Sequence, residues 1–200
     1  MAITFGTLQI EVDPTVYEPA EDSFLLATYA SSLAGRILDI GTGSGIVALS
    51  AAYAGPRNEV IGVDINPAAV ACAKKNAKLN HITNAEFRES DLFSGVSGQF
   101  DAILFNPPYL PTTREERLKA AQENAAYDGG YSGMEVFYRF AGDVSRYLPS
   151  GGRVGVIATS LKDGIGHSLS QLRQSVGIAS VVAQEDFFFE KIALVEAIKP

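Results

Sequence analysis

Short apolar runs alternate along the chain with longer stretches in which apolar and polar positions are mixed. The runs at residues 36–40, 60–63 and 101–105 are compact and rich in Ile, Leu, Val and Phe. Runs of this kind are typical of buried strands, and the mixed stretches between them are typical of helices. The alternation predicts an α/β fold with one doubly wound, mostly parallel sheet that carries helices on both faces.

The same pattern extends to both ends of the chain. Residues 3–5 and 8–12 alternate around a Gly-Thr pair and predict a small hairpin, and a helix is expected between Pro19 and about residue 33. We expect residues 1–35 to form a hairpin and helix packed on the core, and residues 36–200 to form the body of a single domain with a seven-stranded sheet. The other expected elements are helices at 46–54, 67–78, 133–148 and after 162, and strands at 85–88, 154–158, 178–183 and 192–198.

The segment Asn106-Pro107-Pro108-Tyr109 follows directly after the strand expected at 101–105. A residue before proline is pushed out of the helical region, so Asn106 should be extended, and two prolines in series stiffen the chain that follows. The amide oxygen of Asn106 and a backbone carbonyl, that of Pro107, can each accept a hydrogen bond from a flat NH2 group, and Tyr109 would pack beside it. The segment predicts an amine-binding catalytic site, with a rigid turn as the alternative.

The strand at 36–40 is followed by three alternating glycines, Gly41, Gly43 and Gly45. Glycines at this place permit a tight turn and let a ligand approach the backbone closely. The helix expected after them offers free N–H groups to an anion, such as a carboxylate. Asp39 precedes the first glycine by two residues, so the sequence predicts that this acid and the glycines bind a ligand together.

A further acid, Asp64, ends the strand expected at 60–63, about 20 residues past the glycines, where an acid suits a ribose diol. Asn66 and Pro67 then predict the cap and the first residue of a helix. Strand, glycine turn, helix, strand and acid together indicate a unit that binds a nucleoside. Dehydrogenases that use nicotinamide are disfavoured, because their fingerprint needs Gly or Ala where Ile46 stands.

Asp91 and Leu92 follow the strand expected at 85–88, and such a pair can hold the amine of adenine and cover its ring. Together these features resemble the class I S-adenosylmethionine-dependent methyltransferases, over residues 17–198. The resemblance implies a Rossmann-like sheet and S-adenosylmethionine as the cofactor. The residues that it implies for cofactor binding are Ser23, Asp39, Gly41, Gly43, Gly45, Asp64, Ile65, Asp91, Leu92 and Asn106.

The segment Tyr17-Glu18-Pro19-Ala20-Glu21-Asp22-Ser23 narrows the resemblance. It is similar to the stretch before the first strand of the HemK-like glutamine methyltransferases, above all those of the short eukaryotic and archaeal branch. Asp128-Gly129-Gly130 with Gly133 resembles a loop found shortly after the Asn-Pro-Pro-Tyr motif of that family. The resemblance implies methylation of a glutamine in a protein, the one in the Gly-Gly-Gln loop of a class I translation release factor.

The same branch implies a partner. Its members work with a small zinc-binding activator protein in a heterodimer, which is expected to dock near the edge strand at 85–88. Bacterial members usually carry a separate N-terminal helical domain, for which this chain has no room. An activator would also cover apolar surface that otherwise favours aggregation.

Three other functions are alternatives to glutamine methylation. Many adenine-amine methyltransferases of DNA and RNA carry the same tetrapeptide, lysine methylation is a further option, and so is a non-catalytic, protein-binding member of the fold. Composition weighs against nucleic acid as a direct substrate. The chain has 23 acidic and 16 basic residues, a net charge of −7, and no basic stripe of the kind that binds phosphates.

Composition also sets expectations for location and metals. No apolar run approaches the ~20 residues needed to span a membrane, and no signal peptide is visible, so a cytoplasmic protein is expected. The single cysteine, Cys72, is expected to be a buried structural thiol. His81 and His167 have no metal-ligand spacing to other residues, so no metal site is expected.

Two segments carry expectations for the substrate side. The connection at residues 110–131 is too long for a plain turn and is expected to form a flap over the substrate. Phe187, Phe188 and Phe189 join the last two expected strands. They are expected to cap the end of the sheet or to pack on that flap, with a platform for the substrate as the alternative.

Overall fold

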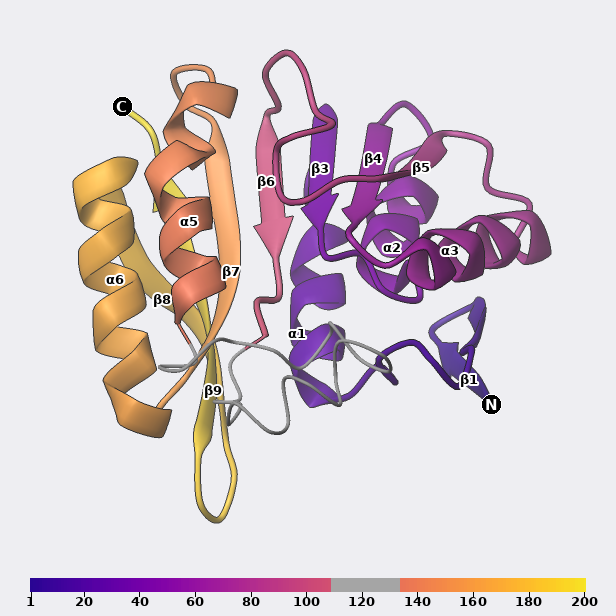
Figure 1. The fold of residues 1–200 in the computed structure, drawn as a ribbon, viewed down its shortest axis with the longest axis horizontal. Coiled ribbons are helices and arrows are strands. Elements are labelled where there is room, and N and C mark those ends of the chain that lie inside the picture. The colour runs from indigo at the N-terminus through magenta and orange to yellow at the C-terminus, as the bar shows by residue number, and fades with distance from the viewer. Residues whose placement is uncertain (109–133) are drawn as a thin grey trace.

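The computed structural model of the chain describes residues 1–108 and 134–200. Three expectations therefore lie outside the described residues. They concern Tyr109, the flap at 110–131, and the loop that contains Asp128, Gly129, Gly130 and Gly133. The described residues form a main sheet with helices on both faces and a separate N-terminal hairpin (Figure 1).

The main sheet consists, in the described part of the chain, of seven strands: β3 (Arg36–Ile40), β4 (Glu59–Asp64), β5 (Ala85–Glu89), β6 (Ala102–Phe105), β7 (Arg153–Thr159), β8 (Ile178–Asp186) and β9 (Lys191–Ile198). Figure 1 shows them side by side in the order β5-β4-β3-β6-β7-β9-β8. The strands from β5 to β7 are parallel, and β9 is antiparallel to both of its neighbours. The predicted doubly wound, mostly parallel sheet is confirmed.

The chain changes direction across the sheet between β3 and β6. From β3 it moves outward to β4 and β5, and it then returns to pair β6 with the other side of β3. Ile40 lies opposite Phe105 in this pairing, so Gly41 and Asn106 follow at the same edge of the sheet. In open α/β sheets, such a switch point at the carboxyl ends of the strands is where ligands bind.

Five helices cover the sheet in the described part of the chain: α1 (Glu21–Ala30), α2 (Ile46–Ala54), α3 (Pro67–Leu79), α5 (Glu135–Asp143) and α6 (Gly164–Ser175). Successive residues of a strand point to opposite faces, and the buried residues accordingly form two cores. Ile37 and Leu104 lie in the core with α1, α2 and α3. Leu38 and Ile103 lie in the core with α5 and α6. The fold thus has three layers, with the sheet in the middle.

Local sequence signals predicted one helix end well and another poorly. Asn66 accepts a hydrogen bond from a backbone N–H of the first turn of α3, and Pro67 is its first residue, as predicted. The helix expected at 133–148 is wrong at its end. The α-helix stops at Asp143, and a 3-10 turn, η2 (Val144–Tyr147), continues the chain. Such tighter turns are common at helix ends, because they satisfy carbonyls that the α-helix leaves free.

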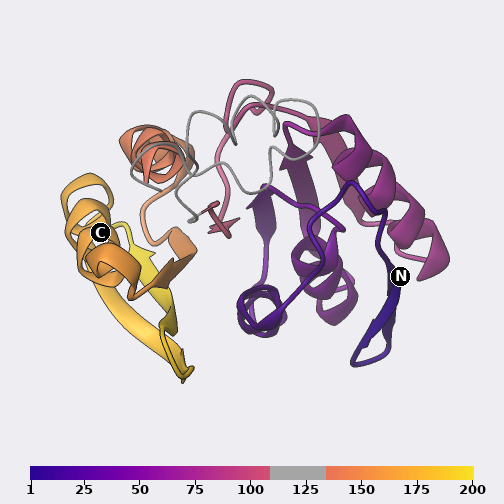
Figure 2. The ribbon, with the colours of Figure 1, turned by 60° about the horizontal axis from the view of Figure 1, so that its bottom comes forward.

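The N-terminal hairpin is a sheet of its own, formed by β1 (Ala2–Phe5) and β2 (Leu8–Glu11) in antiparallel register. Figure 2 shows it beside α3, at the opposite flank of the molecule from the C-terminus. The Phe5 ring stacks on Phe24 of α1, with ring centroids 5.6 Å apart. The hairpin is thus in contact with helices of the main fold.

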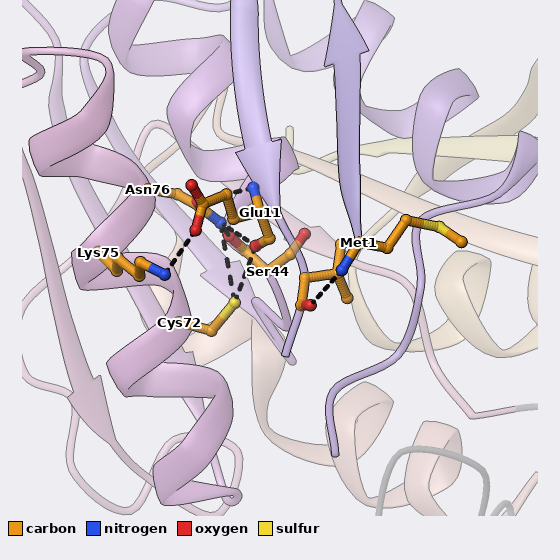
Figure 3. Close-up of polar contacts among 7 residues, drawn as sticks. Met1, Glu11, Ser44, Cys72, Lys75 and Asn76 are labelled. Carbon is orange, nitrogen blue, oxygen red and sulfur yellow. Dashed lines mark hydrogen bonds and ion pairs between the residues drawn. The ribbon is translucent and has the colours of Figure 1, made fainter. Parts of the chain in front are cut away.

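Asn76 of α3 and Asn80, which caps the end of that helix, bind β2 in the way that a third strand would. Asn80 bonds the N–H and the carbonyl of Gln9, and Asn76 bonds the N–H and the carbonyl of Glu11. Asn76 is fully buried, and it also donates to the carbonyl of Ser44 at 2.9 Å (Figure 3). One side chain therefore connects the hairpin, α3 and the glycine turn.

Cys72 lies on the same helix and faces the same strand. It is buried, and its thiol donates to the carbonyl of Glu11 at 3.2 Å (Figure 3). Burial raises the pKa of the thiol, which disfavours the nucleophilic thiolate. These observations confirm the prediction of a structural thiol.

Helix α1 is fastened to the last strand of the chain. The hydroxyl of Tyr29 donates to Glu196 Oε1 at 2.6 Å, and Arg153 donates to the same oxygen at 2.9 Å. Burial and the neighbouring Glu196 carboxylate raise the pKa of Tyr29 far above its usual range. Tyr29 also lies against Gly155, where a Cβ atom would come within 2.8 Å of its ring. The helix is therefore held on β7 and β9.

The aromatic residues between β8 and β9 do not cap the sheet. Figure 1 shows this hairpin extending beyond the carboxyl ends of the parallel strands. Phe188 and Phe189 at its tip are 93% and 88% exposed, so the expectation that they cap the end of the sheet is wrong. Phe187 is 40% exposed, and the expected packing of these rings on the flap lies outside the described residues. No helix among the described residues is long and apolar enough to cross a membrane.

Candidate active site

The glycine turn after β3 has a backbone that only glycine adopts easily. Gly41, Gly43 and Gly45 have φ values of 68°, 55° and 86°. At Gly45 an added Cβ would lie 2.9 Å from the Cβ of Ala73, because α2 starts close to α3 there. At Gly43 an added Cβ would meet only a backbone oxygen, at 3.9 Å. The turn is therefore tightly packed below and open above, which leaves room for a ligand against the backbone.

Asp39 supports this turn from below. Its side chain is only 2% exposed, and it accepts a hydrogen bond from the hydroxyl of Thr42 at 2.7 Å. Burial raises the pKa of Asp39 to about 7, although the Thr42 bond and a backbone N–H from Ala48 act against the shift. The described contacts of Asp39 are thus with the turn and with the first turn of α2, and its role in binding a ligand stays a prediction.

Asp64 connects the end of β4 to the same turn. Its two carboxylate oxygens accept hydrogen bonds from the N–H groups of Gly43 and Asn66, both at 2.9 Å. Burial raises its pKa. Ile65 follows it and is 58% exposed, which is unusual for a large apolar residue at the end of a buried strand. An acid and an exposed apolar side chain thus lie side by side, as a ribose and a ring would require.

Asp91 and Leu92 follow β5 at the same edge of the sheet. The backbone of Ser90 donates to the Asp64 carbonyl at 2.9 Å, which places this turn next to the end of β4. Asp91 is exposed, and Arg139 of α5 donates to its carboxylate at 2.7 Å. Sequence reasoning did not find Arg139, because the contact joins two elements that are distant in the chain.

Asn106 follows β6, and its two amide ends have different surroundings. Its nitrogen donates to Asp22 Oδ2 at 3.0 Å. Its oxygen Oδ1 is buried, and no described residue donates a hydrogen bond to it. The glycine turn is adjacent, since a Cβ on Gly41 would lie 3.9 Å from the Asn106 carbonyl. The predicted acceptor is therefore present, and it has an unused hydrogen-bonding site.

Asp22 is a second residue that sequence reasoning missed. It is 1% exposed, in the first turn of α1, and it accepts hydrogen bonds from Tyr17 Oη at 3.1 Å and from Asn106. Its second oxygen accepts from the N–H and the hydroxyl of Ser23. An acid in the first turn of a helix is ordinarily explained by the helix dipole, so its type and position gave no signal of a role in the site.

The structure thus brings most predicted site residues to one edge of the sheet. The glycines, Asp39, Asp64 and Asn106 are connected by the contacts above, and Pro107 is buried next to Asn106. Ser23 is 5% exposed and bonds Asp22, so its predicted place over the cofactor stays a prediction. Tyr109 lies outside the described residues. The described residues contain no group of three His, Cys, Asp or Glu side chains that could hold a metal ion.

Two protein-family models match the chain. The family model described as "Methyltransferase small domain" matches residues 20–126. A second model, described as "Eco57I restriction-modification methylase", matches residues 74–181. The two matches together cover the glycine turn, Asn106 and the sheet as far as the start of β8.

Whole-chain similarity is found in a curated relative and in solved structures. A putative protein N5-glutamine methyltransferase of Methanocaldococcus jannaschii is 40% identical over 198 residues, 98% of each chain. The E. cuniculi Mtq2–Trm112 complex, responsible for methylation of the eRF1 termination factor, superposes with a TM-score of 0.71 at 22% identity, over 93% of this chain and 99% of that one. The T. thermophilus 16S rRNA N2 G1207 methyltransferase in complex with AdoMet and guanosine gives 0.76 at 19% identity, over 100% and 50%.

These structures confirm the predicted Rossmann-like methyltransferase fold. Bacterial release factor glutamine methyltransferases also match, but they are longer proteins. The chain spans 39% of the one from Aliivibrio fischeri and 64% of the one from Moorella thermoacetica. With a family model over more than half of its length and a relative of the same length at 40% identity, the chain belongs to the methyltransferase small-domain family, among relatives named as protein glutamine methyltransferases.

Proposed function

We propose that the protein methylates the side-chain amide nitrogen of a glutamine in another protein, with S-adenosylmethionine as the methyl donor. The observation that carries the proposal is the buried, unused Oδ1 of Asn106, a residue whose backbone carbonyl lies beside the glycine turn. An amide NH2 group has two N–H donors, and this oxygen together with the backbone carbonyl of Pro107 would accept them. Tyr109 would pack beside the bound amide.

The residues present fit the cofactor. The open backbone at Gly43 would lie against its methionine part, with Asp39 beneath, and Asp64 would hold the ribose. The exposed Ile65 and the Asp91-Leu92 turn would contact the adenine. S-adenosylmethionine supplies an electrophilic methyl group on a sulfonium.

The contribution of the protein is then mainly alignment. A carboxamide nitrogen is a poor nucleophile, because its lone pair is delocalised into the carbonyl. Holding both N–H groups favours the pyramidal geometry of the reacting nitrogen and points its lone pair at the methyl group. Positioning of this kind contributes ~7–11 kcal/mol in well-oriented systems. The proton leaves after transfer, so the site needs no dedicated base.

We further propose that the substrate is the glutamine of the Gly-Gly-Gln loop of a class I translation release factor. The support is the name of the full-length archaeal relative, the names of the bacterial ones, and the eRF1 methylation complex of the same fold. The proposal places the enzyme in the cytoplasm, where translation factors act.

The proposed function is tested by methyl transfer from labelled S-adenosylmethionine to a release factor. Labelling is expected with the native Gly-Gly-Gln loop and is expected to disappear when its glutamine is replaced by alanine. Asn106→Ala should lower kcat by about 100-fold or more, because it removes an oriented hydrogen-bond acceptor, and it should change cofactor affinity much less, since the other cofactor-binding residues remain. Equal labelling of the two release factors would reject the assignment of the substrate.

A second candidate function is methylation of the exocyclic amine of adenine in RNA or DNA. The match of residues 74–181 to a restriction-modification methylase model favours it, since adenine presents a similar NH2 group to Asn106. The net charge of −7 opposes it. Strong labelling of nucleic acid, together with binding that weakens steeply as the salt concentration rises, would establish this function instead.

We also propose a small zinc-binding activator protein as a partner in a heterodimer. The support is the Mtq2–Trm112 complex, a two-protein assembly that contains the same fold. The β5 strand forms one edge of the main sheet and pairs only with β4 among the described residues. An open edge of this kind is a surface on which a partner can dock. Co-expression with the activator should raise solubility and activity, whereas equal yields and rates without it would contradict the proposal.

A further inference from the structure

We propose that Asp22 is a positioning residue, which determines which end of the Asn106 amide faces the substrate. The inference rests on the proposed function, because it requires that Asn106 accept a hydrogen bond from a substrate N–H. The observations are the 3.0 Å hydrogen bond from Asn106 Nδ2 to Asp22 Oδ2 and the buried Asn106 Oδ1 that no described residue bonds.

The amide of an asparagine has two ends of nearly equal shape, so packing alone does not choose between them. An ionised carboxylate accepts hydrogen bonds and cannot donate them. The amide end that faces Asp22 must therefore be the NH2 group, and the oxygen must point the other way. Asn106 therefore turns its oxygen, a free acceptor, away from Asp22, because Asp22 is a carboxylate.

Asp22 is itself held in place. It is 1% exposed, and hydrogen bonds reach its two oxygens from different sides. Tyr17 donates to Oδ2 at 3.1 Å, on the side of Asn106, and the Ser23 backbone N–H donates to Oδ1 at 2.6 Å. A carboxylate bonded at both oxygens cannot rotate without losing a donor, so the orientation that it imposes on Asn106 is fixed before a substrate arrives.

The orientation decides whether the site binds an amine. If the Asn106 amide were reversed, its NH2 group would face the NH2 group of the substrate, and two donors would meet with no acceptor between them. A buried donor without a partner destabilises the complex by the full free energy of its desolvation. A correctly fixed acceptor needs no reorganisation during the reaction, which is the condition under which such groups contribute most to the rate.

The two residues are 84 positions apart in the sequence, on α1 and after β6. Asp22 therefore acts on the substrate side of the site, whereas its neighbour Ser23 is predicted to lie near the cofactor. A change at Asp22 should lower kcat or raise KM for the methyl acceptor, while the affinity for S-adenosylmethionine stays the same.

Asp22→Asn is the sharpest test, because it keeps the size of the side chain. The Ser23 N–H retains the remaining oxygen, so the new NH2 group faces Asn106 and reverses its amide. We expect kcat/KM for the methyl acceptor to fall about 100-fold, with cofactor affinity and melting temperature close to those of the wild type. Glu21→Gln is the matched control, since it makes the same chemical change one residue earlier, and it should retain full activity.

A reversed pair supplies the rescue. Asn106→Asp alone places two carboxylates 3.0 Å apart and should be poorly active. The double variant D22N/N106D exchanges donor and acceptor, and an oxygen faces the substrate again. We expect it to be about tenfold more active than either single variant, as coupled sites behave. A double variant no better than the single ones, or an Asp22→Asn enzyme with wild-type kcat/KM, would overturn the inference.

A measurement without substrate separates this inference from the proposed function. In amide NMR spectra, the Asn106 side-chain signals are assigned by their loss in Asn106→Asp. They should move in Asp22→Asn and stay in place in Glu21→Gln. If the wild type does not label a release factor but these signals move as expected, the proposed substrate is wrong and the positioning role stands. Unchanged Asn106 signals in Asp22→Asn would reject the positioning role, whatever the substrate.

Discussion

Asp22, Asp39 and Asp64 are three of the acids at the site, and different groups surround each of these carboxylates. Donors from separate elements reach both oxygens of Asp22. Burial is the largest influence on the pKa of Asp39 and raises it to about 7. Burial also raises the pKa of Asp64. At the residue scale, the same side-chain type thus serves to orient a neighbour, to support a turn and to join two strand ends.

The raised pKa of Asp39 predicts that stability falls as the pH rises from about 4 to about 7. Across this range the unfolded chain has released the proton, since the ordinary pKa is 3.8, while the folded protein still binds it. Each pH unit then lowers the free energy of unfolding by about 1.4 kcal/mol through this group. Asp39→Asn removes the titration, so urea unfolding should show a flatter pH profile. Parallel profiles for the two proteins would contradict the assignment.

Gly45 should tolerate no side chain. Gly45→Ala would put a non-glycine residue at a φ of 86° and its Cβ 2.9 Å from that of Ala73, so we expect the free energy of unfolding to fall by about 2–4 kcal/mol. Gly142→Ala on α5 is the matched control, because an added Cβ there meets nothing within 4 Å. Chemical denaturation of both variants measures the difference, and equal stability would refute the packing argument.

At the scale of elements, α3 does more than cover the sheet. Asn76 and Asn80 lie one helical turn apart, so both face β2 and bond alternate residues of that strand. A helix normally contributes apolar side chains to a neighbouring strand. Here it supplies backbone-like hydrogen bonds, and Asn76 extends them to the glycine turn.

Asn76→Ala should therefore destabilise the protein more than Asn80→Ala. Loss of Asn76 removes the hydrogen bonds that its side chain makes to the buried carbonyl of Ser44 and to the N–H of Glu11, and we expect the free energy of unfolding to fall by about 2–4 kcal/mol. The bonds of Asn80 to Gln9 are exposed, so their loss should cost about 1 kcal/mol. Urea unfolding ranks the two variants, and hydrogen exchange at the Glu11 amide should quicken in the first. The reverse ranking would contradict this role of Asn76.

Local patterns predicted best the elements whose structure is determined by residues within one short segment of the chain. The glycine turn, Asp64 and the Asn66 cap all appear where the sequence placed them. The pairs that form the substrate side could not be predicted in this way. Asn106 was found through its proline neighbours, but its partner Asp22 lies on another element, and so does the Arg139 that bonds Asp91.

Exposure was the other quantity that local pattern did not determine. Three consecutive phenylalanines indicate burial on composition alone, yet Phe188 and Phe189 lie at the tip of a hairpin that leaves the sheet. The length of β8 and β9 beyond their neighbours decides this, and strand length depends on pairing between distant residues. The same limit applies to α5, whose end follows from how the next turn packs.

At the scale of the whole molecule, one sheet carries both cores, and the N-terminal segment contributes to one of them. Leu8, Ile10 and Leu26 are buried in the same cluster as Ile37 and Leu104. Burial of such side chains contributes about 1.5–3 kcal/mol each. These contacts support the proposal that residues 1–35 and 36–200 form a single domain.

Thermal unfolding should accordingly show one cooperative transition. The chain has eight tyrosines and no tryptophan, so near-ultraviolet circular dichroism reports tertiary packing and far-ultraviolet circular dichroism reports secondary structure. We expect the two melting curves to coincide, as they do for a two-state domain. Separate transitions would instead indicate that the N-terminal segment unfolds on its own.

The anchorage of α1 on the final strand has a consequence for how distant substitutions act. The helix that begins with the Asp22 turn is held near its other end by Tyr29 and Glu196. Loss of the Tyr29–Glu196 hydrogen bond would let α1 tilt about its packed middle. The tilt would displace the Asp22 carboxylate that aligns Asn106. A substitution at Glu196, four residues from the last one, would then slow the enzyme although every motif residue is intact.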